Sequence, residues 1–282
     1  MELQSDKIKA IAIDLDGTVL GDNAKLSGRA RRALGGCIAR GLRVIIATGR
    51  CMKSAEAYRA AIGAEGPAVY YNGAMTLYMP ARATLEKHTV GQEAISCCAD
   101  IARAENIHFQ VFICRGDGAD FSETLVAEKP SDATKAYMER TGLDFMYGDL
   151  NEAMTGEDSA YCVKGIFIDK EAKLRRVQRL VHERLGNAVN TMTSADFILE
   201  VLAGGVTKAS GLRSAMAFYG LRTEEIIAFG DEENDIGMLS FAGYSVAPAN
   251  ARKSVQDAAD LVVGANTDDG VARFLEKTFA LS

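Results

Sequence analysis

The feature that most constrains this chain is an apolar run, Ile11-Ala12-Ile13, that leads directly into Asp14-Leu15-Asp16. An uncharged run rich in β-branched side chains predicts a buried strand. Because side chains alternate along a strand, Asp14 and Asp16 point the same way at its carboxyl end. Carboxylates beside a dry core are costly unless something positive compensates them. We therefore expect a divalent cation together with an anionic substrate at this point.

The composition limits the class of protein. A chain of 282 residues fits one large domain or two, and 48% hydrophobic with 25% charged residues is ordinary for a globular protein. A net charge of −6 disfavours nucleic acid as the main partner. No apolar run approaches the length of a membrane span, and the polar segment 1–9 lacks the apolar centre of a signal peptide. We expect a cytoplasmic monomer or small homo-oligomer that binds neither nucleic acid nor membranes.

The cysteines and histidines do not suggest a metal site of their own. The six cysteines include no Cys-x-x-Cys pair, and the three histidines are widely scattered. We expect the cysteines to be reduced and in apolar surroundings, and a His/Cys zinc site is disfavoured.

Strands and helices alternate at both ends of the chain. The continuous apolar character of the strands predicts a doubly wound parallel sheet covered by helices on both faces. The expected strands are 11–14, 42–47, 68–71, 226–229, 244–246 and 261–263, and the expected helices are 28–40, 54–62, 208–219 and 270–280.

The regular alternation of strands and helices is interrupted in the middle of the chain. A hairpin is expected over 75–79 and 84–88, then helices over 92–105 and 171–185, with strands over 107–114, 163–168, 188–192 and 197–201. Residues 116–160 are mixed and give no clear pattern. The simplest organisation is α/β, with a parallel-sheet core of residues 1–84 and 190–282 that is interrupted by a second α/β domain of residues 85–189.

A second acidic cluster, like the first, directly follows an apolar strand. The apolar strand 226–229 runs into Gly230 and then into Asp231-Glu232-Glu233-Asn234-Asp235. In open α/β sheets, ligands bind outside the carboxyl ends of the strands, so Asp14, Asp16, Asp231 and Asp235 are expected to meet at one rim. A thiol-free set of oxygens suits Mg²⁺.

Three further residues are suited to an anion at the same rim. Lys208 begins a helix after Gly204-Gly205-Val206-Thr207, and its charge would offset the acids and hold a phosphate oxygen. Thr48 and Gly49, at a strand end before a helix, supply a hydroxyl and backbone N–H groups. Alone, each of these features is more often a turn, a helix cap or a solvated lysine. In this order, each at a strand end, they favour a phosphate site.

Together these motifs resemble the haloacid dehalogenase superfamily phosphatases of the Cof type, over essentially the whole chain. Asn72-Gly73-Ala74 and Asn250-Ala251 also fall where such proteins carry similar turns, whereas Ala247-Pro248-Ala249-Asn250 departs from relatives that carry Met and Gly. The four matching motifs are Asp14-Leu15-Asp16-Gly17-Thr18, Ile46-Ala47-Thr48-Gly49-Arg50, Val206-Thr207-Lys208-Ala209 and Gly230-Asp231-Glu232-Glu233-Asn234-Asp235.

The resemblance implies a Mg²⁺-dependent phosphomonoesterase that acts on a small phosphorylated metabolite through an aspartyl-phosphate. Asp14 would be the nucleophile and Asp16 the general acid and base. Asp14, the backbone carbonyl of Asp16 and Asp231 would hold the metal, with Asp235 behind them. Thr48, Gly49, Lys208 and Asn234 would bind the phosphoryl group.

The resemblance also implies a Rossmannoid core, with the inserted domain as a cap that would close over the site and select the leaving group. Arg115 and Asp117, near the end of an expected strand of this domain, are candidate substrate contacts. Two other functions stay open at this point: a phosphomutase of the same superfamily, and a phospholigand-binding regulator without turnover. An ion-pumping ATPase is disfavoured, because Asp14 is followed by Leu-Asp-Gly and no membrane spans are expected.

Overall fold

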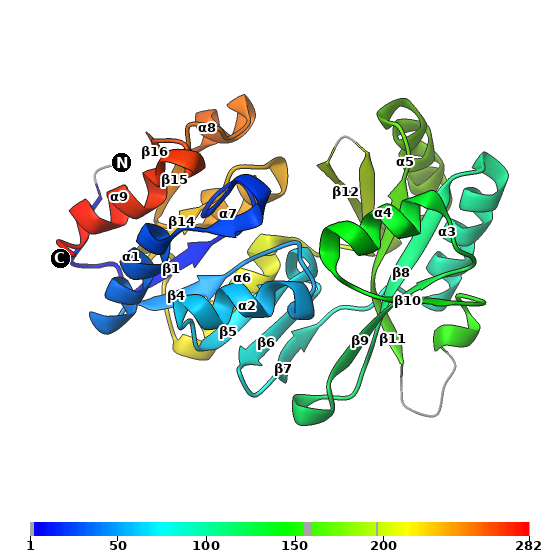
Figure 1. The fold of residues 1–282 in the computed structure, drawn as a ribbon, viewed down its shortest axis with the longest axis horizontal. Helices are drawn as coiled ribbons and strands as arrows, with labels where there is room; N and C mark the ends of the chain where they lie inside the picture. Colours follow the sequence, from blue (N-terminus) through cyan, green and yellow to red (C-terminus); the bar gives the residue numbers. More distant parts are fainter. Residues whose placement is uncertain (1–2, 155–159, 196, 282) are drawn as a thin grey trace. The chain divides into compact units, whose positions relative to one another are not determined.

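In the computed structural model, residues 3–154, 160–195 and 197–281 are described. Contacts divide the chain into two compact units, one of residues 1–51, 55–80 and 207–282, and one of residues 52–54 and 81–206 (Figure 1). Within the described residues no helix is long and apolar enough to cross a membrane.

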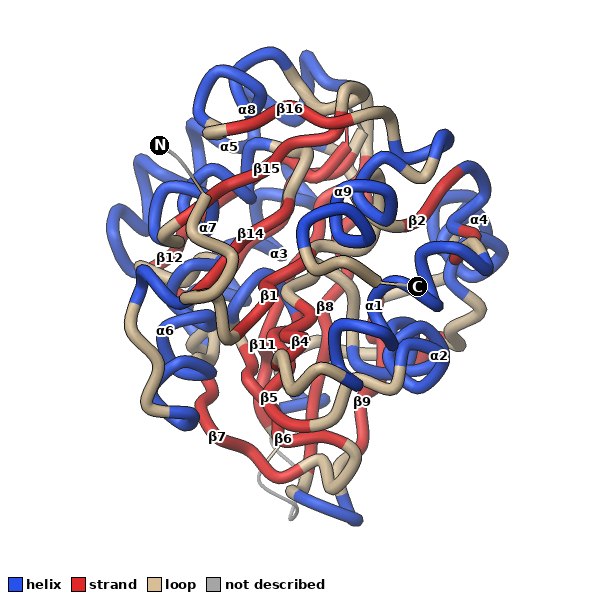
Figure 2. The backbone as a smooth tube through the Cα atoms, turned by 90° about the vertical axis from the view of Figure 1, so that its left-hand side faces the viewer, coloured by secondary structure: helices blue, strands red, loops and turns tan. Residues whose placement is uncertain are grey.

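The first unit is built on a parallel sheet, as the sequence predicts. Its strands lie in the order β16-β15-β14-β1-β4 (Figure 2). β5 extends the sheet through a parallel bridge between Ala47 and Val69, and β6 (Met75–Met79) runs antiparallel to β5. The bounds are β1 Ala10–Ile13, β4 Arg43–Ile46, β5 Gly66–Tyr70, β14 Ile226–Phe229, β15 Tyr244–Pro248 and β16 Leu261–Val263.

Alternate residues of the central strands pack against helices on opposite faces. Ala12 and Ala228 share a buried cluster with residues of α6, α7 and α8. Phe229, the next residue of β14, packs instead against Phe274 of α9, with ring centroids 5.8 Å apart. The doubly wound architecture is therefore confirmed. The helices are α1 Gly28–Ala39, α2 Met52–Ile62, α6 Lys208–Tyr219, α7 Ile236–Phe241, α8 Lys253–Ala258 and α9 Gly270–Thr278.

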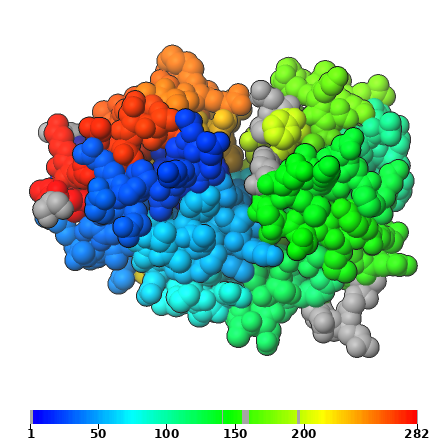
Figure 3. Space-filling model, viewed as in Figure 1, coloured from blue at the N-terminus to red at the C-terminus, as the bar shows by residue number. Residues whose placement is uncertain are grey.

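The two ends of the first unit are held side by side. The Ser27 hydroxyl caps α1, accepting from the Ala30 N–H at 2.9 Å. Arg29 on α1 pairs with Glu276 on α9 at 2.6 Å. The C-terminal helix, red in Figure 3, accordingly lies against the blue N-terminal segment. Two short strands, β2 (Leu20–Gly21) and β3 (Lys25–Leu26), follow the β1 loop.

The second unit contains a six-stranded, mostly antiparallel sheet in the order β10-β9-β8-β11-β13-β12. Helices α3 (Gln92–Glu105) and α5 (Glu171–Leu185) bury an apolar core against one face of it. The third helix is α4 (Asp132–Thr141). The strands of this sheet are β8 His108–Arg115, β9 Ser122–Ala127, β10 Phe145–Tyr147, β11 Tyr161–Ile168, β12 Val189–Ala195 and β13 Ile198–Ala203, and β7 (Ala83–Lys87) lies outside it.

The limits of this unit differ from those expected from the sequence, 85–189. β13 pairs with β11 along its length, and β12 pairs with β13, so both strands belong to the second sheet. The unit accordingly runs from Ala81 to Val206 and includes 52–54. The sequence patterns predict strands over 188–192 and 197–201, but they do not indicate to which of the two sheets these strands belong.

Candidate active site

The loop after β1 carries the first pair of acids. Asp14 is buried, and its N–H donates to the carbonyl of Phe229 at 3.1 Å. Gly17 adopts a φ of +75°, and a Cβ there would lie 2.1 Å from Asp231 Oδ2. Thr18, fully buried, donates from its hydroxyl to Asp231 Oδ1 at 2.6 Å. The loops after β1 and β14 are therefore packed tightly together.

Lys208 lies between two of the acids. It is the first residue of α6, whose N-cap Thr207 forms a capping box with Ser210. Its Nζ donates to Asp14 Oδ1 and to Asp235 Oδ1, both at 2.7 Å, and its side chain is only 2% exposed. The structure thus brings together three residues that are far apart in the sequence.

Asp235 is held from several sides. Besides accepting from Lys208, it accepts through Oδ2 from the backbone N–H groups of Asp231 and Glu232, both at 3.1 Å. A Cβ on Gly230 would lie 2.4 Å from Asp235 Cβ, so the glycine permits this close approach. Asp235 therefore fixes the position of both Lys208 and the Asp231 backbone.

The electrostatics of this cluster favour a cation. Burial raises the pKa of Asp14 well above its usual value, although the charge of Lys208 opposes the shift. Burial also raises the pKa of Asp231 to about 7, opposed by the hydrogen bond from Thr18. Burial lowers the pKa of Lys208, but Asp14 and Asp235 outweigh it and the net direction is upward. One ammonium group thus faces three buried carboxylates.

The geometry fits a hard divalent cation. Asp14, Asp231 and Asp235 each offer a carboxylate oxygen, and these atoms lie within 4.8 Å of one another. It is the single group of this kind found among the described residues. Oxygen ligands of this type suit Mg²⁺, which takes few protein ligands.

The loop after β4 holds the second part of the site. Thr48 is buried, its N–H donates to the Val69 carbonyl at 2.9 Å, and its hydroxyl accepts from the Arg50 N–H at 3.1 Å. Arg50 donates to both oxygens of Asp16 at 2.6 Å and lies over the ring of Tyr58. Asp16 is half-exposed, unlike Asp14. Sequence reasoning did not assign a role to Arg50.

Asn72 is a second residue that sequence reasoning missed. It is fully buried in the turn after β5, and its Oδ1 accepts from Asn234 Nδ2 at 3.0 Å. A Cβ on Gly49 would lie 2.9 Å from Asn72 Oδ1, so these two residues are in close contact. The Asn-Gly pair at a strand end indicates a turn, but it does not indicate what the side chain meets.

Arg115 and Asp117 have partners inside the second unit. Arg115 Nη2 donates to the carbonyl of Ala153 at 3.0 Å, and Asp117 Oδ1 accepts from the Thr84 N–H at 2.7 Å. Hydrogen bonds with Thr84 also lower the pKa of Asp117. Both side chains thus support the local fold, and their contact with a substrate stays a prediction.

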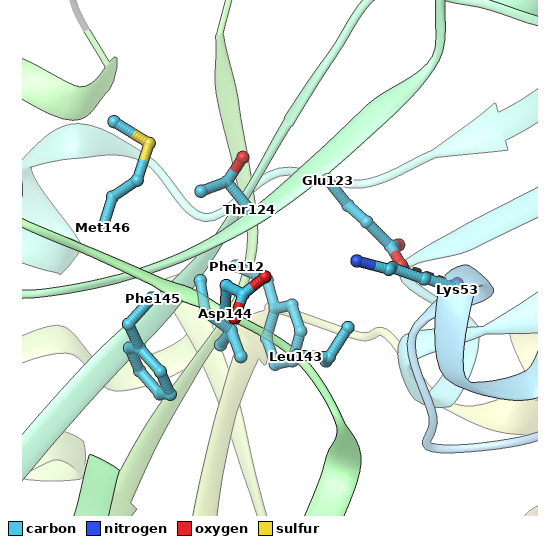
Figure 4. A pocket seen from close by; sticks show the side chains of 9 residues that line it. Lys53, Phe112, Glu123, Thr124, Leu143, Asp144, Phe145 and Met146 are labelled. Carbon is cyan, nitrogen blue, oxygen red and sulfur yellow. Dashed lines mark hydrogen bonds between the residues drawn. The ribbon is translucent and has the colours of Figure 1, made fainter. Parts of the chain in front are cut away.

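A pocket of about 150 Å³ lies elsewhere in the second unit. Figure 4 shows the ring of Phe112 and the side chain of Leu143 among charged groups. Neither Arg115 nor Asp117 lines it. Its apolar residues are Phe112, Leu125, Leu143, Phe145 and Met146, and its polar residues are Lys53, Glu123, Thr124 and Asp144.

Comparison with known proteins gives consistent results. The model of the haloacid dehalogenase-like hydrolases matches residues 11–275. A 5-amino-6-(5-phospho-D-ribitylamino)uracil phosphatase, YitU of Bacillus subtilis, is 30% identical over 283 residues, covering 96% of this chain and 97% of its own. The Escherichia coli phosphatase YbjI, named for the same substrate, is 27% identical and covers 96% of each chain.

Solved structures share the fold. A haloacid dehalogenase-like hydrolase from Bacteroides thetaiotaomicron superposes with a TM-score of 0.82 at 26% identity, covering 96% of this chain and 99% of its own. TM0651 from Thermotoga maritima gives a TM-score of 0.80 at 28% identity, covering 96% and 97%.

Proposed function

We propose a reaction for this chain, which belongs to the haloacid dehalogenase-like hydrolase family and is a Cof-type phosphatase. It hydrolyses a small phosphorylated metabolite through an aspartyl-phosphate on Asp14. The observation that carries the proposal is the contact of Lys208 Nζ with Asp14 Oδ1 and Asp235 Oδ1 inside a buried group of carboxylates. A buried lysine that shares its hydrogen bonds between acids can orient one of them as a nucleophile.

In the proposed first step, Asp14 Oδ2 forms the bond to phosphorus while the phosphorus–oxygen bond to the leaving group breaks. The hydrogen bond from Lys208 to Asp14 Oδ1 supports this assignment, because it engages the other carboxylate oxygen. Asp16, as the carboxylic acid, gives its proton to the departing alkoxide. The product alcohol leaves, and the phosphoryl group remains on Asp14.

The second step reverses the role of Asp16. Its carboxylate takes a proton from water as the water oxygen attacks phosphorus, and the bond from phosphorus to Asp14 breaks. This releases inorganic phosphate and restores both carboxyl groups to their starting states. The half-exposed position of Asp16 supports a role in exchanging protons with water and leaving group.

Mg²⁺ is the cation that we propose for the acidic cluster. Asp14, Asp231 and the backbone carbonyl of Asp16 would hold it, and Asp235 would support them through its bonds to Lys208 and the Asp231 backbone. When bound, the cation supplies positive charge that offsets the charge on the phosphoryl oxygens.

We propose that four residues bind the transferring phosphoryl group. Lys208 supplies charge, Thr48 a hydroxyl, Gly49 a backbone N–H and Asn234 a side-chain amide. Such preorganised donors act most strongly where water is excluded, and Thr48 and Lys208 are both buried.

The second unit is proposed to choose the leaving group, because no residue assigned to phosphoryl transfer lies in it. Its pocket near Phe112 combines aromatic and charged side chains, which suits a polar organic molecule. Two relatives are named for a phosphorylated ribitylaminouracil, and this compound is therefore the first metabolite to test.

The test is a panel of phosphorylated metabolites and p-nitrophenyl phosphate, assayed with Mg²⁺ for release of inorganic phosphate. Asp14→Asn is the control for contaminating phosphatase. We expect release from the wild-type protein alone. An isomerised phosphate ester without free phosphate would instead indicate a mutase, and no turnover of any ester would refute the proposal.

A further inference from the structure

We propose that Asn72 is a positioning residue for phosphoryl transfer, which fixes the amide of Asn234 and the loop of Thr48 in their working orientations. The inference rests on the proposed function, because it assigns Asn234 and Thr48 to the phosphoryl group. It concerns a side chain from a loop that carries none of the groups proposed to touch the substrate.

The backbone of Asn72 links two loops. Asn72 has a φ of 56° and a ψ of 29°, a left-handed conformation that asparagine and glycine tolerate best. Its N–H donates to the Thr48 carbonyl at 3.0 Å, and the preceding Tyr71 N–H donates to the Arg50 carbonyl at 3.0 Å. The turn after β5 is thereby joined to both ends of the loop 48–50.

The next residue brings the same turn against the start of α6. Gly73 has a φ of 101°, and a Cβ there would lie 2.0 Å from the carbonyl oxygen of Thr207. Thr207 is the N-cap that precedes Lys208. The turn therefore touches the loop after β4 and the helix that carries the buried lysine.

The side chain of Asn72 reaches a third loop. It is fully buried, where an amide without partners would be costly, and its Oδ1 accepts from Asn234 Nδ2 at 3.0 Å. Gly49 has no Cβ, and the space a Cβ would fill is taken by the Asn72 amide, 2.9 Å away. A larger residue at position 49 would therefore collide with the Asn72 side chain.

This contact determines what Asn234 can offer. A side-chain amide has two N–H groups, and Asn72 uses one of them, so the plane of the Asn234 amide is set and the second N–H keeps a defined direction. Asn234 Oδ1 is buried with no hydrogen-bond partner among the described residues. The second N–H and the Oδ1 of Asn234 can therefore both form hydrogen bonds with a ligand. Asn72 is the residue that orients this amide.

The competing explanation is that Asn72 is there only for its left-handed backbone. Glycine adopts that conformation without strain, so Asn72→Gly keeps the turn and removes only the side chain. Asn106, which ends α3 with a φ of 48°, gives a matched control, because Asn106→Gly makes the same change outside the first unit. Asn72→Ser, too short to reach Asn234, serves if the glycine variant does not fold.

The experiment compares wild type, Asn72→Gly, Asn234→Ala, the double variant and Asn106→Gly in the full chain. Steady-state kinetics with p-nitrophenyl phosphate and inhibition constants for inorganic phosphate are measured, with melting temperature as a check on folding. We expect Asn72→Gly to lower kcat/KM by about 10–100-fold, as a misplaced binding group does, and to weaken phosphate inhibition by about tenfold. Asn106→Gly should match wild type.

The double variant decides between the two explanations. If Asn72 acts through Asn234, adding Asn72→Gly to Asn234→Ala should cost less than the Asn72→Gly change alone, because the amide it orients is gone. Losses that multiply in full, or Asn72→Gly with wild-type kinetics and phosphate inhibition, would overturn this inference. Absence of turnover in the wild-type protein would instead refute the proposed function.

Discussion

The guanidinium of Arg50 donates one hydrogen bond to each carboxylate oxygen of Asp16, both at 2.6 Å. Such a two-point contact sets both the position and the plane of the carboxylate. In the proposed mechanism Asp16 moves the protons, so Arg50 controls a group that must face first the leaving oxygen and then water.

We expect Arg50→Ala to lower kcat by about tenfold or more, since a general acid and base contributes roughly 10²–10⁴-fold and orientation is part of that. KM should change little, because Arg50 contacts Asp16 rather than the phosphoryl group. Arg50→Lys should not restore the rate, since an ammonium group lacks the planar fork. Steady-state kinetics separate the two parameters, and a raised KM with normal kcat would assign Arg50 to substrate binding.

The two aspartates of the first loop should respond differently to amide substitution. Asp14→Asn should abolish turnover, and its melting temperature without metal should be equal to or above that of wild type. The reason is that burial raises the pKa of Asp14, so its ionised form is disfavoured in the folded protein. Asp16→Asn should lower the rate by about 10²–10⁴-fold. Turnover of Asp14→Asn near the wild-type rate would exclude the proposed nucleophile.

Metal removal should abolish activity, and Mg²⁺ should restore it. Asp231→Ala should weaken Mg²⁺ affinity more than Asp235→Ala, because Asp231 is proposed as a direct ligand. Asp235→Ala should instead cost more stability, about 3–5 kcal/mol, since it removes a partner of the buried Lys208. Metal titrations and denaturant unfolding measure the two effects. Full activity in EDTA would contradict the metal assignment.

The second unit should carry a pH dependence of its own. Burial lowers the pKa of His108 below 6.5, although a hydrogen bond with Gln110 opposes the shift. The unfolded chain therefore binds more protons there than the folded chain, and stability present above pH 6.5 is lost as the pH falls through the folded pKa. The melting temperature of wild type relative to His108→Gln should thus decline between pH 7.5 and pH 5. A constant difference would show that His108 does not titrate in this way.

Much of the fold was predictable because local patterns were strong. The helices expected at 92–105, 171–185 and 208–219 have those bounds in the structure. Parallel strands place their carboxyl ends at one edge, which is why acids after the strands near residues 13 and 229 were expected together. Lys208 was expected there because it follows a glycine-rich turn at a helix start.

The rest depended on information that local patterns do not contain. α4 lay in the segment without a clear pattern, although its capping box at Ser131 and the glycine that ends it were signals. α7 and α8 have six residues each, too short to show helical periodicity. The partners of Arg50 and Asn72 follow from how separate loops pack, as does the assignment of β12 and β13 to the second sheet.

The central claim is that Asp14 becomes phosphorylated. The direct measurement is mass spectrometry of peptides from enzyme quenched in acid during turnover of a phosphate ester. We expect one added phosphoryl group on the peptide that contains Asp14, located at Asp14, decaying when substrate is exhausted and absent from Asp14→Asn. An active enzyme that shows no phosphoryl group on Asp14 under conditions where the intermediate is trapped, or one that carries it on another residue, would contradict the account.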